Sequence, residues 1–308
     1  MDPRSPGRPS QFLGTMLVGA ATSSLAVLTG TSRPTIDRLM AEAGLRDVDS
    51  RQRLHWLLQT ARKLFGGWLR RAAGRVFDRY VREYRCGGLV FHIPQDLTTL
   101  ETRAEFLVNR YESVERRFAR KYVPRDATVI ELGGCLGVVA CLVNRRLADP
   151  RRHVVFEPHP EIARYLEANR ERNDCRFQIR RQIVAEANPA AFYLRDPYIG
   201  GSSMHRPSGR RIEVPTVTIA KLEQETGLHF DTLVIDIEGA EHAFFAENGD
   251  LLGRARVVIV EFHPQIIGEV ACEESRDRLE AAGLRQRNRV RSVEAWSRPG
   301  GGDPQPSA

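Results

Sequence analysis

Two kinds of hydrophobic pattern alternate along the chain from residue 128 onward. Short apolar runs predict buried strands, and segments whose apolar residues recur every three or four positions predict helices. The predicted strands are 128–132, 153–157, 177–184, 233–237 and 257–261. The predicted helices are 138–147, 161–171, 219–226, 241–247 and 274–282, and the alternation around Phe192 and Ile212 predicts β hairpins. Strands that alternate with helices are typical of a parallel sheet covered on both faces, so the sequence predicts a doubly wound, mostly parallel α/β domain.

Two helical segments are predicted upstream of this alternation. Residues 51–85 carry apolar side chains at helical spacing together with ten basic and two acidic residues. The pattern fits a basic amphipathic helix that contacts an anionic membrane surface or a partner, and it also fits a helix whose apolar stripe packs on the domain. The second helix begins after Thr98, which forms a predicted capping box with Glu101, and ends before Pro124.

The N-terminal region contains an uncharged run at residues 11–32. Its 22 residues could span a bilayer, but many glycine, serine and threonine residues lower its hydropathy. A membrane anchor or interfacial segment, a signal peptide and a soluble extension are all compatible with this run. Contact with a membrane surface through residues 11–85 therefore stays open.

Composition and charge narrow the choice of partners and location. The five cysteines are an odd number without a C-x-x-C pair, which argues against a disulfide framework or zinc ribbon and favours the cytoplasm. Residues 1–124 contain 21 Lys and Arg against 12 Asp and Glu, whereas the remainder contains 25 against 27. The basic excess thus belongs to the N-terminal part, and we expect no nucleic-acid partner for the α/β domain.

The ends of the first two predicted strands carry candidate ligand-binding residues. Ligands bind at the carboxyl ends of strands in an open parallel sheet, where a glycine turn lets them approach a helix N-terminus. The glycine spacing here does not fit a dinucleotide fingerprint or a P-loop, while a carboxylate after the second strand can accept hydrogen bonds from both ribose hydroxyls. The two strand ends, Glu131 with its glycine turn and Glu157, together predict an adenosine-containing ligand.

These motifs resemble the FkbM family of S-adenosylmethionine-dependent methyltransferases. The matches are 129–137 for V-I-D/E-x-G-x-x-x-G, 156–160 for F-E-P-x-P, 216–222 for T-V-x-L-x-x-L, 236–241 for D-x-E-G-A-E and 257–261 for an apolar strand ending in Glu. The resemblance implies a Rossmann-like class I methyltransferase fold, S-adenosylmethionine as cofactor and O-methylation of a sugar or natural product. The expected organisation is an N-terminal extension at 1–95, a methyltransferase domain at 96–297 and a disordered tail at 298–308.

The resemblance also implies roles for individual residues. Glu131, Gly133, Gly134, Cys135 and Gly137 would form the cofactor turn, with Cys135 contributing its backbone. Glu157, followed by Pro158, would hold the ribose. Asp236 and Glu238 would lie beside the transferable methyl group, with Asp236 also contacting the cofactor.

Methyl transfer to an alcohol requires a group that removes the hydroxyl proton. The candidates after the fourth and fifth strands are Asp236, Glu238, His242, Glu261 and His263. We expect His263 to take the proton and Asp236 and Glu238 to position the acceptor, because histidine titrates near neutral pH; a structural role for His263 is the alternative. The same residues could hold a divalent metal, but we expect none, since acidic residues at strand ends often serve cofactor and substrate.

Two other classes of function remain as alternatives. A catalytically inactive Rossmann-like binding or scaffold protein would bind cofactor without turnover, although the intact D-x-E-G-A-E block argues against it. A nucleic-acid methyltransferase could use the basic segment 51–85, but the domain is slightly acidic and lacks an N-P-P-Y motif. Residues 193–213 are expected to shape the acceptor pocket. The sequence identifies neither the acceptor nor the oligomeric state.

Overall fold

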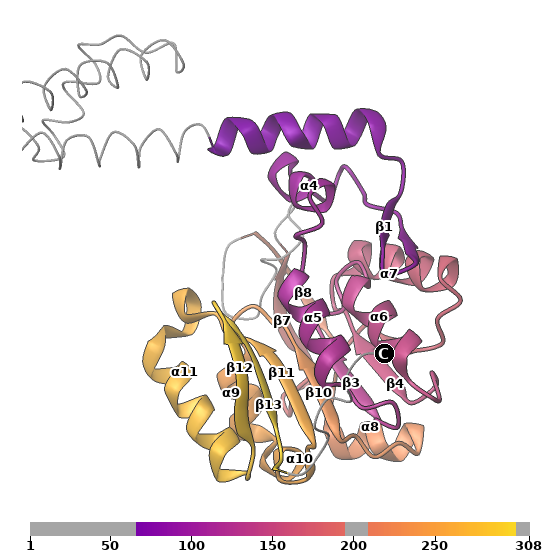
Figure 1. Cartoon of the computed structure of the whole chain (residues 1–308). Helices are drawn as coiled ribbons and strands as arrows, with labels where there is room; N and C mark the ends of the chain where they lie inside the picture. Colours follow the sequence, from indigo (N-terminus) through magenta and orange to yellow (C-terminus); the bar gives the residue numbers. More distant parts are fainter. Residues whose placement is uncertain (1–65, 195–208, 300–308) are drawn as a thin grey trace, which may run out of the picture. The chain divides into compact units, whose positions relative to one another are not determined.

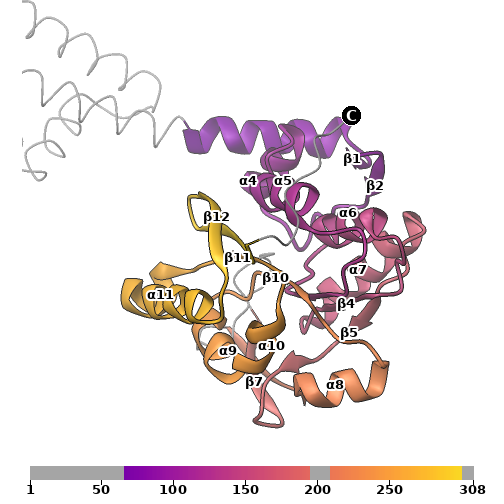
Figure 2. The same cartoon turned by 60° about the horizontal axis from the view of Figure 1, so that its bottom comes forward.

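A seven-stranded sheet forms the centre of the structure, a computed structural model that describes residues 66–194 and 209–299. The strand order is β12-β13-β11-β10-β3-β4-β5. Figure 1 labels the strands from β12 to β4, and Figure 2 labels β5. The strands are β3 (Val129–Leu132), β4 (His153–Phe156), β5 (Gln178–Arg180), β10 (Thr232–Ile235), β11 (Val257–Glu261), β12 (Arg285–Val290) and β13 (Val293–Ser297). Neighbouring strands from β5 to β11 are parallel, and β13 lies antiparallel between β11 and β12. The predicted doubly wound, mostly parallel α/β fold is confirmed.

Eight helices accompany the strands between residues 100 and 281 of the described part of the chain. They are α4 (Leu100–Leu107), α5 (Ser113–Tyr122), α6 (Val138–Arg146), α7 (Pro160–Arg172), α8 (Ile219–Thr226), α9 (Glu241–Glu247), α10 (Gly249–Arg254) and α11 (Pro264–Ala281). In both cartoon views, α6 and α7 lie toward the β4 end of the sheet, while α9 and α11 lie toward β11 and β12 (Figures 1 and 2).

The two faces of the sheet are both apolar. Successive residues of a strand point to opposite faces. Val129 of β3 belongs to a hydrophobic cluster with Phe118 of α5 and Val143 of α6. Its neighbour Ile130 belongs to another cluster with Phe244 of α9. Because both faces are covered, nearly every residue of these strands is apolar. The sequence pattern predicted the strands for this reason.

Three pairs of short strands lie outside the central sheet. They are β1 (Tyr84–Cys86) with β2 (Leu89–Phe91), β6 (Ile183–Val184) with β9 (Thr216–Val217), and β7 (Ala190–Leu194) with β8 (Arg210–Val214). The single strand predicted at 177–184 is therefore two strands, since its second part pairs with β9 and leaves the central sheet. The predicted hairpin segments pair with each other, with Phe192 opposite Ile212.

The helix predicted between Thr98 and Pro124 is also divided in two. Asn109 and Glu112 have left-handed backbone conformations, with φ of 55° and 46°, and they separate α4 from α5. Thr99, not Thr98, caps α4 by accepting a hydrogen bond from the backbone N–H of Thr102 at 3.0 Å. Thr98 instead donates its hydroxyl to the carbonyl of Pro94, so its side chain is not available as a cap.

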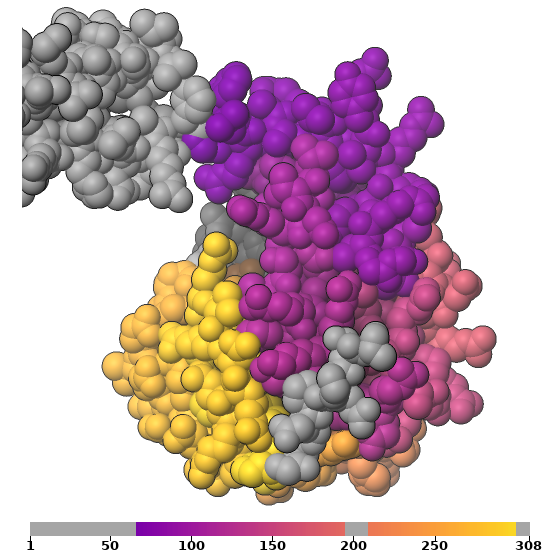
Figure 3. Space-filling view, in the orientation of Figure 1, coloured from indigo at the N-terminus to yellow at the C-terminus, as the bar shows by residue number. Residues whose placement is uncertain are grey.

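The C-terminal hairpin of β12 and β13 was not predicted. Glu294 of β13 is fully buried, where its carboxylate accepts hydrogen bonds from Arg276 of α11 at 2.9 Å and from the indole of Trp296 at 3.0 Å. In the space-filling view, the yellow surface of this hairpin adjoins the magenta surface of the α5 region (Figure 3), and α5 contacts β13. The hairpin is thus fixed to helices from two other parts of the domain.

The chain divides into two compact units, Met1–Arg75 and Val76–Ala308. Within the second unit, Phe77, Tyr84 and Phe91 are buried in one hydrophobic cluster. The segment 76–95, which the sequence analysis assigned to the N-terminal extension, therefore contributes to the core. We propose that the domain begins near Val76 and not at residue 96.

Helical structure in the described part of segment 51–85 extends over residues 66–80. Four apolar residues of the predicted stripe are exposed there: Trp68, Leu69, Val76 and Tyr80. Among the described residues, no helix is both long enough and apolar enough to cross a membrane. The uncharged run at 11–32 lies outside the described residues.

Candidate functional site

The turn between β3 and α6 packs so closely on its surroundings that it requires glycine. Gly133 has φ of +87°, and a Cβ added there would lie 1.8 Å from the backbone oxygen of Asp236. A Cβ on Gly134 would lie 2.3 Å from the side chain of Val155. Gly137, with φ of +82°, begins α6, whose first N–H groups form the positive end of the helix dipole. The predicted cofactor turn thus lies directly against the end of β10.

Glu157 is buried next to this turn. Its Oε2 accepts a hydrogen bond from the backbone N–H of Cys135 at 2.9 Å, and its Oε1 accepts one from the N–H of His159 at 2.9 Å. Burial raises the pKa of Glu157 to about 7, although the two backbone hydrogen bonds lower it. Each carboxylate oxygen can accept two hydrogen bonds, so each retains one position. Two positions side by side match the two hydroxyls of a ribose. Pro158 separates this carboxylate from His159, which caps α7.

Glu131 lies inside the layer of the sheet and contacts His153 of β4. The distance from Nε2 of His153 to Oε2 of Glu131 is 3.2 Å. The amide nitrogen of Asn144 lies 3.4 Å from Nδ1 of His153. Because this nitrogen is a donor, Nδ1 accepts, and the proton of the neutral ring is on Nε2. Burial raises the pKa of Glu131 to about 8 and lowers that of His153 to about 3. The two side chains therefore form a buried, uncharged pair at neutral pH.

The segment between α4 and α5 also contacts the predicted cofactor turn, which the sequence analysis did not predict. The hydroxyl of Tyr111 lies 3.1 Å from the thiol of Cys135 in the cofactor turn. Burial and the charge of Glu115 raise the pKa of the neighbouring Glu112 to about 8. Both Tyr111 and Glu112 precede the matched motifs and lie at a helix break, so no motif could reveal that they lie near the turn.

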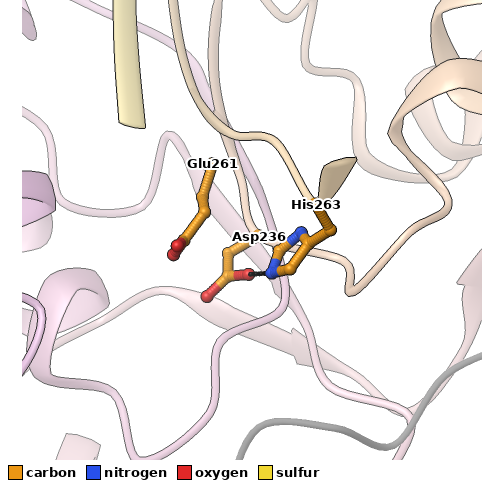
Figure 4. Close-up of side chains that lie close together, drawn as sticks. All are labelled: Asp236, Glu261 and His263. Atoms are coloured by element: carbon orange, nitrogen blue, oxygen red, sulfur yellow. Dashed lines mark ion pairs between the residues drawn. The ribbon is translucent and has the colours of Figure 1, made fainter. Parts of the chain in front are cut away.

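Acidic side chains and one histidine gather at the ends of β10 and β11. We call Asp236, Glu238, Glu241, Glu261 and His263 the acid–histidine cluster. One ligand atom each of Asp236, Glu261 and His263 lies within 4.8 Å of the others, and their side chains point toward one another (Figure 4). Nε2 of His263 is 3.6 Å from Oδ1 of Asp236 and 3.7 Å from Oε2 of Glu238.

Glu241 holds the other nitrogen of the same ring. This fully buried residue of α9 accepts a hydrogen bond from Nδ1 of His263 at 2.7 Å and from the N–H of Gly239 at 3.0 Å. Burial lowers the pKa of His263, but the hydrogen bond to Glu241 and the charges of Asp236 and Glu238 outweigh it and raise this pKa to about 9. Burial and the charge of Glu261 raise the pKa of Asp236. The cluster therefore stabilises positive charge at the ring of His263.

The remaining candidate, His242, points elsewhere. Its Nδ1 lies 3.2 Å from the carbonyl oxygen of Ala271, and its Nε2 lies 3.4 Å from Glu274, both in α11. Glu261 stays in the cluster and accepts a hydrogen bond from Ser292 at 2.8 Å. The structure thus brings together four of the five proposed base or metal residues. Of the expected acceptor segment 193–213, residues 195–208 lie outside the described residues.

The predicted cofactor turn and the acid–histidine cluster lie next to each other at one edge of the sheet. The backbone N–H of Asp236 donates to the carbonyl of Leu132 at 2.9 Å, and the backbone oxygen of Asp236 faces Gly133. The parallel register of β3, β10 and β11 places their carboxyl ends at the same edge of the sheet. A ligand at the turn would therefore also lie next to Asp236.

Comparisons with known proteins identify a family and a set of similar structures. The family model described as the methyltransferase FkbM domain matches residues 131–286. A comparison with curated proteins found no match.

The similar solved structures include three at low sequence identity. A protein of the NADB-Rossmann superfamily from Streptococcus agalactiae has 10% identity and a TM-score of 0.37, covering 60% of this chain and 67% of its own. A putative O-methyltransferase from Klebsiella pneumoniae has 13% identity and a TM-score of 0.36, and the match covers 60% of this chain and 80% of that protein. A precorrin-6y C5,15-methyltransferase from Geobacter metallireducens has 11% identity and a TM-score of 0.38, and the match covers 68% of this chain and 93% of that protein.

Proposed function

The chain belongs to the FkbM methyltransferase family, and we propose that it transfers the methyl group of S-adenosylmethionine to a hydroxyl of a sugar or natural product. The proximity of the cofactor turn to the acid–histidine cluster carries this proposal. Asp236 contacts the turn through its backbone and the cluster through its side chain. A methyl donor and the groups that handle the acceptor hydroxyl would then meet at one strand end.

In this proposal, the turn and Glu157 bind the cofactor. The open acceptor positions of Glu157 take the ribose hydroxyls, and the backbone from Gly133 to Gly137 lies along the cofactor. S-adenosylmethionine carries a sulfonium and an ammonium group, and both suit an edge rich in carboxylates such as Asp236. Glu131 supports the turn from within the sheet through its contact with His153.

Asp236, Glu238 and His263 are the proposed catalytic residues. Methyl transfer is a direct displacement at a carbon already activated by the sulfonium, so the protein must align the acceptor oxygen and remove its proton. Nε2 of His263 lies 3.6 Å from Oδ1 of Asp236 and 3.7 Å from Oε2 of Glu238. In this proposal the acceptor hydroxyl approaches the methyl group beside these three side chains.

Calorimetry with S-adenosylhomocysteine, the demethylated form of the cofactor, tests the cofactor assignment. We expect the full chain to bind it and Glu157→Ala to weaken binding about tenfold or more, because the ribose loses a charged hydrogen-bond acceptor. Glu167→Ala is the matched control, since Glu167 is an exposed carboxylate paired with Arg181 on the surface. Binding of NADH without any response to S-adenosylhomocysteine would contradict the proposal.

The class of acceptor can be tested with a methyl-labelled cofactor. We expect label to pass to hydroxyl-bearing sugars or polyketides and to remain attached in mild alkali, because a methyl ether resists hydrolysis. Label released by alkali would instead identify a methyl ester and hence a carboxylate acceptor.

A further inference from the structure

We propose that the acid–histidine cluster binds a divalent cation, with Nε2 of His263 and one carboxylate oxygen each of Asp236 and Glu261 as ligands and with Glu241 orienting the histidine. Cation binding stands on the geometry of these side chains alone. Only the catalytic role of the cation rests on the proposed function.

The spacing of the three ligand atoms fits a single ion. A small divalent cation binds its ligands at about 2.1 Å, which separates adjacent ligands by about 3 Å and opposite ligands by about 4.2 Å. The three atoms lie within 4.8 Å of one another, and Nε2 of His263 is 3.6 Å from Oδ1 of Asp236. Small side-chain rotations would bring all three to bonding distance, because the side chains already converge from two adjacent strand ends (Figure 4).

The ring of His263 is oriented as a metal-binding histidine. Its Nδ1 donates to Glu241, whose Oε1 also accepts from the N–H of Gly239, so the ring proton is fixed on Nδ1. In the neutral ring the lone pair of Nε2 then faces Asp236. Histidines that bind metals almost always donate their other nitrogen to a carboxylate or carbonyl in this way. The His263 side chain is only 7% exposed, and its Nε2 forms no hydrogen bond with any of the described residues.

One oxygen of the carboxylate that faces this nitrogen also lacks a hydrogen-bond partner among the described residues. Oδ1 of Asp236 is out of contact with solvent and, within the described ranges, accepts no hydrogen bond. Asp236 and Glu261 place two carboxylates close together at the ends of neighbouring strands. A cation bound between them would neutralise the charge of both carboxylates and satisfy the buried oxygen at the same time.

The ligand set indicates which cation to expect. Magnesium and calcium prefer oxygen ligands alone, whereas one imidazole with two carboxylates suits manganese or zinc. We therefore use Mn²⁺ as the probe.

Within the proposed function, a cation here would lower the pKa of an acceptor hydroxyl. The hydroxyl proton would pass to Glu238, while the oxygen forms its bond to the methyl carbon and the sulfonium leaves as a neutral thioether. Glu238 is suited to this role because it lies near Nε2 of His263 and is not one of the three ligands.

Calorimetric titration of the full chain with Mn²⁺ after chelator treatment and dialysis tests the site. We expect one equivalent to bind, His263→Ala and Asp236→Asn to weaken binding at least tenfold, and Glu241→Gln to weaken it about 10 to 100-fold. His242→Ala should bind Mn²⁺ like the unmodified protein, because His242 contacts α11 instead. Thermal unfolding with and without Mn²⁺ gives a second measurement. Mn²⁺ should raise the melting temperature of the unmodified protein and not that of folded His263→Ala.

Equal Mn²⁺ affinity in the unmodified protein, His263→Ala and Asp236→Asn would overturn the site, and so would the absence of binding at millimolar Mn²⁺. A separate titration with S-adenosylhomocysteine in the presence of chelator keeps the two proposals distinct. Loss of that binding with Mn²⁺ binding intact would contradict the proposed function and leave the cation site standing.

Discussion

Glu131 and Glu157 show how neighbouring groups give two residues of the same type different roles. Glu131 faces a histidine inside the sheet and has no backbone N–H donor among its described hydrogen bonds, so burial leaves it uncharged at neutral pH. Glu157 accepts two backbone N–H groups that partly offset its burial. Glu157 therefore ionises more readily than Glu131, and its carboxylate is the better placed of the two to accept hydrogen bonds from a ligand.

This difference predicts how cofactor affinity depends on pH. The ionised form of Glu157 accepts the ribose hydroxyls, and its pKa is raised to about 7. Affinity for S-adenosylhomocysteine should therefore be constant above about pH 8 and fall by up to about tenfold per unit below pH 7. Calorimetry between pH 5.5 and 8.5 measures this. Glu157→Gln should bind weakly throughout with a much flatter profile, and a flat profile in the unmodified protein would contradict the role of Glu157.

At the scale of secondary-structure elements, the turn between β3 and α6 is fixed by contact with β10. Gly133→Ala should destabilise the domain by about 3 kcal/mol or more and abolish cofactor binding, because the new Cβ would overlap the backbone oxygen of Asp236. Gly253→Ala in α10 is the control, since nothing lies within 4 Å of its added Cβ, and it should change stability by less than about 1 kcal/mol. Urea unfolding of the two variants compares them. Similar losses of stability in the two variants would show that the turn can shift to accept a side chain at residue 133, which would contradict this prediction.

The sequence predicted those elements whose side chains carry a clear pattern. α8, α9 and β11 have the predicted bounds because each has a regular apolar pattern. β12 was missed because its outward positions are arginine and glutamine, so it lacks an apolar run. The cofactor turn and the D-x-E-G-A-E block were visible as local motifs. The contacts of Glu241 with His263 and of Tyr111 with Cys135 were not, because they join residues from separate elements.

At the scale of the whole molecule, residues 84–92 belong to the domain. Asn173 accepts a hydrogen bond from the N–H of Val90 at 2.8 Å, and Asn169 accepts one from the N–H of His92 at 2.7 Å. Phe91 is fully buried. Removal of this segment would expose apolar surface and deprive the side-chain oxygens of the buried Asn169 and Asn173 of these N–H donors.

Shortened chains can test this placement. A chain that begins at Gly66 should fold and bind S-adenosylhomocysteine. A chain that begins at Asp96 should be insoluble, or its melting temperature should be well below that of the longer chain. Solubility, circular dichroism and thermal unfolding distinguish the two. Equal melting temperatures would restore the boundary at residue 96 that the sequence analysis expected.

The position of β13 has a consequence for biosynthesis. It is the last strand of the described chain, and it lies between β11 and β12, beyond the residues that the family model matches. A ribosome releases the chain from its N-terminus onward, so β11 has an unpaired edge until Ser297 has left the exit tunnel. Unpaired edges attract other chains and chaperones. The yield of this protein in a cell should therefore depend in part on how well the edge of β11 is protected until β13 has paired with it.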